Sequence, residues 1–148
     1  MQIHIHNEQK DLPLSKRREH ITALIHFVLA QEKRKCDEIG IFFITDTKMR
    51  ALHKEFFDDD SPTDCMSFPV DSEPDCTPCY LGDIFVCPHT ACKFAKPYEE
   101  VTLYILHGLL HLLGYDDIDS SDRKKMRRAE KKYMNHFKAM GLLLHATP

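Results

Sequence analysis

The sequence predicts a single domain in which several helices pack with a small β-sheet. Its 148 residues are enough for one domain with a substantial core, and its 43% hydrophobic and 29% charged content is typical of a soluble globular protein. Four short apolar runs, rich in β-branched and aromatic side chains, are separated by longer segments with apolar residues at helical spacing. No segment approaches the roughly 20 apolar residues of a membrane span, so we expect no membrane association.

The four apolar runs are the predicted strands, at residues 2–6, 39–45, 65–70 and 81–87. The first run alternates apolar and polar residues, which places Ile3 and Ile5 on one face and His4 and His6 on the other. We expect these two histidines to be solvated rather than to bind a ligand. The second run is rich in isoleucine and phenylalanine and predicts a buried strand.

Helices are predicted at residues 13–31, 46–57 and 88–94, from residue 97 through a histidine motif, and at 121–140. Ser15 and Asp46 are the expected N-caps of the first two helices. In the second helix, the side chains expected to point inward are Met49, Leu52, His53 and Phe56. The last helix has an apolar stripe formed by Met126, Ala129, Tyr133, Phe137 and Met140.

The helix that begins at Pro97 is apolar on most faces, so we expect it at the centre of the fold. It carries His107 and His111, four residues apart and therefore one above the other on one helical face. Two imidazoles in that arrangement can bind one metal ion. Gly114 can adopt the left-handed conformation that ends a helix and reverses the chain. That reversal would return Asp117 toward the two histidines.

The predicted metal ligands are therefore His107, His111 and Asp117, two imidazoles and one carboxylate. Zinc accepts this donor set, and three protein ligands leave a fourth position open. The same donor set also suits iron(II). The spacing is similar to that of the metzincin proteases. However, Gly108 stands where a zinc protease carries its general-base glutamate, which argues against proteolysis.

The N-terminus and the cysteines indicate the compartment. The first residues lack the basic and apolar regions of a secretory signal, so we expect a cytoplasmic protein whose six cysteines are thiols. Cys76 and Cys79 form a Cys-x-x-Cys pair, a spacing that can bind zinc or perform redox chemistry. Residues 71–78 are rich in proline and acid and predict an exposed loop, so exposed thiols are the simpler interpretation.

The charges are polarised along the chain, although the net charge is only −3. Residues 55–75 contain eight acids and no base. The polar faces of the last helix carry Arg123, Lys124, Lys125, Arg127, Arg128, Lys131, Lys132 and Lys138. Such a face could bind RNA phosphates or could simply be well solvated, and only its position relative to the metal site decides between these interpretations.

Three blocks of the sequence resemble the YbeY family of bacterial endoribonucleases and rRNA maturation factors. His-Gly-Leu-Leu-His-Leu-Leu-Gly-Tyr-Asp, residues 107–116, resembles the family's signature, which continues with a third histidine where this chain has Asp117. Residues 61–69 resemble the family's Pro-Thr-Asp-Val-Leu-Ser-Phe-Pro block, and residues 81–84 resemble its Leu-Gly-Asp-Ile strand. The blocks occur in the family's order, and the resemblance covers most of the chain.

The family usually has an arginine shortly before the second block, at the position of Phe57 in this chain. An arginine there suits phosphate binding or the stabilisation of charge in a transition state. Arg50 and Lys54, one or two helical turns earlier, are the candidates to replace it.

The resemblance implies that residues 1–148 form a single α+β domain, with a small mixed β-sheet of about four strands packed with helices around a central metal-bearing helix. It implies one zinc ion per chain. It further implies an endoribonuclease that cuts single-stranded RNA in the 3′-end maturation of small-subunit rRNA and in ribosome quality control. The expected partners are this RNA and the small ribosomal subunit or its assembly factors.

For the mechanism we predict zinc-assisted phosphodiester hydrolysis, in which Asp116 or Asp64 orients the water or a histidine and His107, His111 and Asp117 hold the metal. One alternative is a weakly catalytic or non-catalytic ribosome-assembly factor with a metal site. Structural zinc normally has four protein ligands, which argues against it. The other alternative is a metalloprotease-like hydrolase.

Overall fold

The computed structural model describes residues 1–14, 17–59, 61, 63–70 and 79–145. The strands are β1 (Gln2–Asn7), β2 (Glu38–Phe43), β3 (Cys65–Pro69) and β4 (Tyr80–Val86). The helices are α1 (Arg17–Glu32), α2 (Asp46–Phe57), α3 (Pro88–Ala91), α4 (Pro97–Leu112) and α5 (Ser120–Met140). These elements confirm the predicted α+β class.

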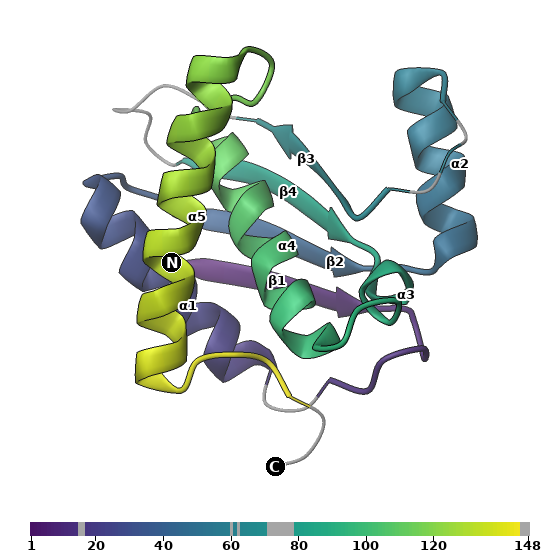
Figure 1. The fold of residues 1–148 in the computed structure, drawn as a ribbon, viewed down its shortest axis with the longest axis horizontal. Coiled ribbons are helices and arrows are strands. Elements are labelled where there is room, and N and C mark those ends of the chain that lie inside the picture. Colours follow the sequence, from purple (N-terminus) through teal and green to yellow (C-terminus); the bar gives the residue numbers. More distant parts are fainter. Residues whose placement is uncertain (15–16, 60, 62, 71–78, 146–148) are drawn as a thin grey trace.

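The four strands form one mixed sheet in the order β1-β2-β4-β3 (Figure 1). β1, β2 and β4 are parallel, and β3 pairs antiparallel with β4 at the edge of the sheet. A mixed sheet of four strands was predicted, and the structure confirms it. The edge strand β3 also contacts α4, so its residues lie beside the helix that carries the two histidines.

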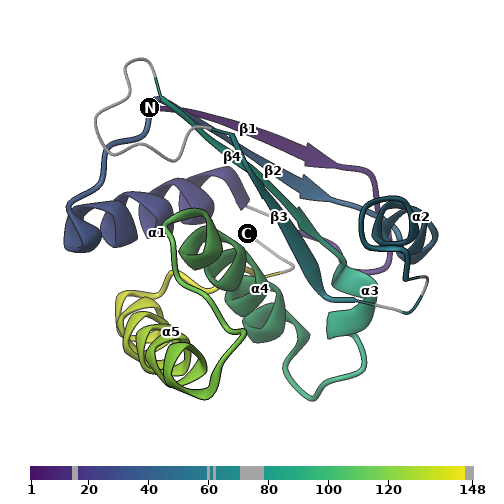
Figure 2. The same cartoon turned by 90° about the horizontal axis from the view of Figure 1, so that it is seen from above.

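Helices α1 and α4 cover one face of the sheet, and α5 lies outside them (Figure 2). Helix α4 contacts β3, β4, α3 and α5 and is buried along most of its length, as its apolar composition predicted. Gly108 permits its close approach to the sheet, because an added Cβ there would lie 2.6 Å from the Cγ2 of Ile84 on β4. The residue type at position 108 therefore sets the packing distance between α4 and β4.

Helix α2 differs most from its sequence-based description. It lies at one end of the sheet, away from the main helical layer (Figures 1 and 2), and of its residues only Met49 is buried. The prediction that Phe56 points inward is wrong, since this side chain is 56% exposed. Asp46 is the first residue of the helix rather than its N-cap. The cap is Thr45, whose hydroxyl oxygen accepts a hydrogen bond from the Lys48 N–H at 3.2 Å.

The other helices differ from their predicted bounds mainly at their ends. Helix α1 begins at Arg17 rather than at Pro13, and the predicted cap Ser15 lies outside the described residues. Helix α5 begins at Ser120, capped by Asp119. Of its predicted apolar stripe, Met140 is 45% exposed, so that assignment is wrong for the final turn of the helix. Within the described part of the chain, no helix is long and apolar enough to cross a membrane.

Candidate metal centre

His107, His111 and Asp117 lie together at the C-terminal end of α4, as their spacing predicted. The two Nε2 atoms of the histidines are 3.0 Å apart. The Asp117 Oδ2 atom lies 3.7 Å from Nε2 of His107 and 3.5 Å from Nε2 of His111. Among the described residues, this is the one group of three side chains whose ligand atoms are close enough to share a metal ion.

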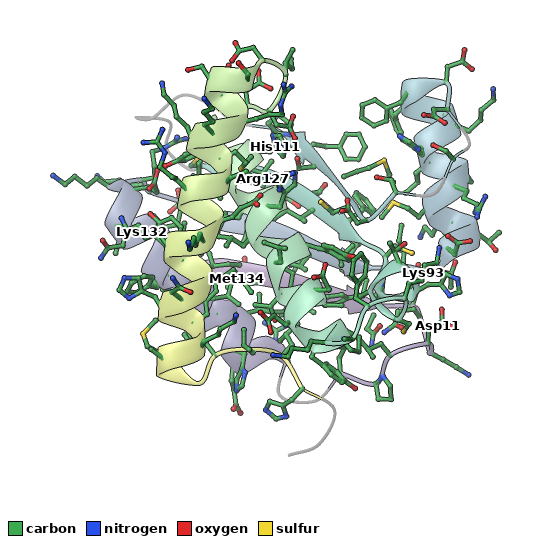
Figure 3. The ribbon with its side chains drawn as sticks, viewed as in Figure 1. Asp11, Lys93, His111, Arg127, Lys132 and Met134 are labelled. Atoms are coloured by element: carbon green, nitrogen blue, oxygen red, sulfur yellow. The ribbon has the colours of Figure 1, made fainter. Side chains whose placement is uncertain are left out.

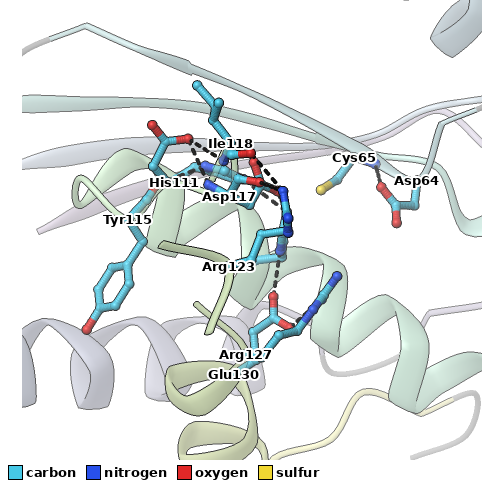
Figure 4. Close-up of polar contacts among 11 residues, drawn as sticks. Asp64, Cys65, His111, Tyr115, Asp117, Ile118, Arg123, Arg127 and Glu130 are labelled. Atoms are coloured by element: carbon cyan, nitrogen blue, oxygen red, sulfur yellow. Dashed lines mark hydrogen bonds and ion pairs between the residues drawn. The ribbon is translucent and has the colours of Figure 1, made fainter. Parts of the chain in front are cut away.

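The turn after α4 brings Asp117 back to the histidines. Helix α4 ends at Leu112, and Gly114 has a φ of +104°, a backbone conformation that residues with side chains rarely adopt. The Tyr115 N–H donates to the carbonyl of Leu110 at 3.0 Å, so the chain folds back against the last helical turn. The predicted role of this glycine is confirmed by its conformation. Figure 4 shows Asp117 returning beside His111.

Hydrogen bonds on the opposite ring nitrogens orient both imidazoles. Nδ1 of His107 lies 2.6 Å from a carboxylate oxygen of Glu130, and Nδ1 of His111 lies 3.0 Å from the carbonyl oxygen of Tyr115. Both partners are acceptors, so in each ring Nδ1 carries the proton. The Nε2 atoms of the two rings therefore face each other and the carboxylate of Asp117. Three acceptor atoms directed at one space suit a bound cation.

The separations of these atoms also suit a metal ion. A tetrahedral zinc with bonds of about 2.0–2.1 Å holds its ligand atoms about 3.4 Å apart. The three observed separations lie between 3.0 and 3.7 Å. The donor set of two imidazoles and a carboxylate is one that zinc uses in catalytic sites and that iron(II) also accepts.

Glu130 is the residue of this site that sequence reasoning missed. Its side chain is 8% exposed, and its second oxygen accepts a hydrogen bond from Nη1 of Arg127 at 2.8 Å. Burial raises the pKa of Glu130, but the hydrogen bonds from His107 and Arg127 outweigh burial and leave the pKa below its ordinary value of 4.5. The carboxylate is therefore ionised at neutral pH. Its position on the apolar stripe of α5, four residues after Met126, is the signal that could have revealed it.

Asp116 does not join the metal-ligand group. Its carboxylate accepts hydrogen bonds from the backbone N–H groups of Asp117 at 2.7 Å and Ile118 at 3.3 Å, which stabilises the turn. Asp64 does line the cleft in front of the group. Its carboxylate is exposed and accepts a hydrogen bond from the Cys65 N–H at 2.7 Å. Of the two predicted orienting acids, only Asp64 therefore lines the cleft that contains the histidines.

The cleft has a volume of about 420 Å³ and lies between α4, α2 and β3. Its lining residues are His53, Phe57, Thr63, Asp64, Cys65, Met66, Ser67, His107, His111 and Asp117. Burial raises the pKa of the Cys65 thiol well above its ordinary value, and the neighbouring carboxylates, that of Asp64 first, raise it further. Cys65 lines the cleft but does not belong to the group of side chains whose ligand atoms lie within 4.8 Å of one another, which among the described residues is His107, His111 and Asp117.

The two cations considered as substitutes for the family's arginine do not line the cleft. Arg50 pairs with Asp46 at 2.8 Å, and Lys54 pairs with Asp58 at 2.9 Å, and neither cation is among the lining residues of the cleft. The prediction that one of them replaces the arginine is not supported by these contacts. The residue present in the cleft is Phe57, which is 56% exposed.

The second cysteine of the Cys-x-x-Cys pair is buried, although an exposed thiol was predicted. Cys76 lies outside the described residues, but Cys79 is buried, with 3% of its surface exposed. Its backbone N–H donates to the Asp37 carboxylate at 2.6 Å, and its carbonyl accepts from the N–H groups of Asp37 and Glu38. The expectation of an exposed thiol at Cys79 is therefore wrong, because these bonds fix it beside the start of β2.

Comparisons with known proteins find relatives over nearly the whole chain. Residues 2–138 match the family model described as Endoribonuclease YbeY. The endoribonuclease YbeY of Protochlamydia amoebophila is 43% identical over 96% of this chain and 97% of its own length, and that of Chlamydia caviae is 36% identical over 89% and 88%. The solution structure of a Thermotoga maritima protein is similar with a TM-score of 0.63 and 26% identity, covering 95% of this chain and 94% of that one. The chain therefore belongs to the endoribonuclease YbeY family.

Proposed function

We propose that this protein is an endoribonuclease that cuts single-stranded RNA by metal-assisted hydrolysis, with His107, His111 and Asp117 as the metal ligands. The observation that carries the proposal is the convergence of two imidazole lone pairs and one carboxylate oxygen within 3.7 Å in an open cleft. The relatives reported above are named endoribonucleases, which supports RNA as the substrate.

A bound zinc ion would lower the pKa of a coordinated water to about 7 and would offset negative charge on the phosphate. The chain's own residues hold the site in a productive arrangement. Glu130 and the carbonyl of Tyr115 keep the Nδ1 protons in place, so His107 and His111 present Nε2 lone pairs without rearranging. Asp64, which lines the same cleft, is the carboxylate that would accept a proton from the attacking water.

The substrate we propose is small-subunit rRNA near its 3′ end, in the cytoplasm, with the small ribosomal subunit or an assembly factor as partner. The resemblance described above supports this assignment. We further propose that residues 1–148 act as one domain. The match of one family model to residues 2–138 supports this.

The two alternatives find less support. For a metalloprotease, a glutamate would be needed at Gly108, where even a Cβ atom would collide with Ile84. The general base of the zinc proteases has no room at that position. For a purely structural metal, a fourth protein ligand would be expected. Among the described residues, the group that could hold a metal offers three ligand side chains and not four.

The test combines metal analysis with RNA cleavage. Purified protein should contain about one zinc per chain and should cut a single-stranded RNA, and a chelator should abolish cleavage until zinc is restored. His111→Ala should lose both metal and cleavage. His4→Ala, which removes a histidine of β1, is the matched control and should retain both. Cleavage by metal-free His111→Ala would show that the nuclease activity comes from a contaminant, and iron in place of zinc would reassign the metal.

A further inference from the structure

One face of α5 forms a groove that is lined almost entirely by cations. The groove has a volume of about 540 Å³, and its lining residues are Ser120, Arg123, Lys124, Arg127, Arg128 and Lys131. Their spacing of three and four residues places them on one stripe of the helix. Five positive charges line this groove, and none of its lining residues is an acid. A stripe of this kind attracts a polyanion.

The groove begins beside the metal-ligand group. Nη1 of Arg127 contacts Glu130, and Glu130 in turn holds His107. Nη1 of Arg123 donates to the carbonyl of Ile118 at 2.7 Å and to that of Asp117 at 3.4 Å. Figure 3 shows Arg127 on α5 beside His111 on α4, and Figure 4 shows Arg123 against the loop that carries Asp117. The cationic groove and the cleft are therefore neighbouring parts of one surface.

The opposite side of the cleft carries the opposite charge. Exposed acids lie in the last turn of α2 and in the segment after it, namely Glu55, Asp58, Asp59 and Asp64, of which Asp58 pairs with Lys54. Arg50 and Lys54, the cations of α2 nearest to this region, are already paired with acids. An RNA strand that reaches the histidines would be repelled on the α2 side and attracted on the α5 side.

We infer that the groove of α5 binds the phosphates of single-stranded RNA and leads the strand to the metal-ligand group. This inference rests on the proposed function. The stripe from Ser120 to Lys131 spans about 17 Å of helix, long enough to follow several phosphates. Lys124, Arg128 and Lys131 make the phosphate contacts, while Arg123 and Arg127 also hold the site together. Contacts of this kind give affinity without sequence preference.

The experiment compares two triple variants that remove the same charge. The groove variant is Lys124→Gln, Arg128→Gln and Lys131→Gln, all at exposed positions. The matched control is Lys10→Gln, Lys35→Gln and Lys93→Gln, exposed lysines outside the groove. The dissociation constant of a fluorescent 12-nucleotide RNA with 2′-O-methyl groups, which resist cleavage, is measured by anisotropy at several salt concentrations.

We expect the groove variant to bind this RNA roughly 10- to 100-fold more weakly at low salt, with the slope of log K against log salt reduced by about 2. The control should bind within about twofold of the parent protein. The zinc content and the melting temperature of both variants should be unchanged. Equal losses in the two variants, or no loss in the groove variant, would overturn the inference. So would equally effective competition by polyglutamate, which would assign the groove to an acidic protein.

Cleavage of the matching unmodified RNA separates this inference from the proposed function. If the parent protein cuts RNA but the groove variant binds as the parent does, only the groove assignment fails. If the groove variant loses binding as expected but the parent never cuts RNA, the proposed nuclease activity fails and the groove remains an RNA-binding surface.

Discussion

Two pairs of histidines in this protein each share one face of their element but differ in what surrounds their rings. His4 and His6 lie on β1, and His107 and His111 lie on α4. In the first pair, Nε2 of His4 contacts Glu38 at 2.9 Å, and the ring of His6 stacks on Phe42 at a centroid distance of 4.9 Å. These two rings therefore serve separate contacts and share no ligand.

The second pair differs in which nitrogen meets its partner. Each pair includes a histidine bonded to a glutamate, but Glu38 occupies Nε2 of His4 whereas Glu130 occupies Nδ1 of His107. In α4 the Nε2 atoms are thereby left to face each other and Asp117. The pair on α4 thus has what the pair on β1 lacks among these contacts: acceptors at both Nδ1 atoms and a third possible ligand facing both Nε2 atoms.

The largest expected effect comes from removing a histidine of one pair or the other. His107→Ala should lower zinc content and RNA cleavage to background, because only two ligands remain. His4→Ala should change neither quantity. Zinc is measured by elemental analysis and cleavage by gel electrophoresis. Equal behaviour of the two variants would remove the distinction drawn between the pairs.

Replacing Asp117, the third possible ligand, should have the next largest effect. Asp117→Ala should weaken zinc binding by at least about 100-fold, since it removes a direct ligand. Asp117→His should keep or improve the affinity, because an imidazole at the same place can also coordinate. Both are measured by competition with a chelator of known affinity. An unchanged affinity in Asp117→Ala would place this carboxylate outside the coordination sphere.

Replacing the glutamate that contacts a histidine of each pair should have a smaller effect. Glu130→Ala should weaken zinc binding by about 10- to 100-fold, because His107 loses the acceptor that fixes its Nδ1 proton. Glu130→Gln should lose less, since the amide oxygen still accepts that hydrogen bond. Glu38→Gln is the matched control in the other pair and should leave zinc affinity unchanged. A loss in Glu38→Gln as large as that in Glu130→Ala would show that the effect is not specific to the site.

The smallest expected effect is a dependence of stability on acid pH. The pKa of Glu130 is lowered in the folded protein, so its contribution to the free energy of unfolding is complete above its ordinary pKa of 4.5. That contribution should disappear as the pH falls through the lower, folded-state pKa. The difference in unfolding free energy between the metal-free parent protein and Glu130→Gln, measured by urea denaturation, should therefore be constant from pH 7 to about 5 and shrink below that. A difference that grows toward acid pH would mean that burial raises this pKa instead.

Local features of the site could be predicted because they depend on short stretches of chain. The position of His107 and His111 on one helical face follows from helix geometry, and the return of Asp117 follows from the conformation that Gly114 permits. The four strands were likewise visible as apolar runs. In each of these cases the relevant residues lie within about ten positions of one another.

Contacts between distant segments could not be predicted in the same way. Glu130 meets His107 from 23 residues away, across the packing of α5 on α4. The exposure of Phe56 depends on α2 lying at the end of the sheet, and the burial of Cys79 depends on its bonds to the start of β2. Helical periodicity shows which side chains share a face but does not show what that face meets.

By itself, therefore, the sequence determined the α+β class, the family resemblance and the three converging ligand side chains. Only the tertiary structure decided which acid supports His107, which of Asp64 and Asp116 faces the cleft, and where the basic face of α5 lies. The physical reason is the range of the interactions involved. Backbone geometry relates neighbours in sequence, whereas the hydrogen bonds and charges that complete this site join segments that only the packed fold brings together.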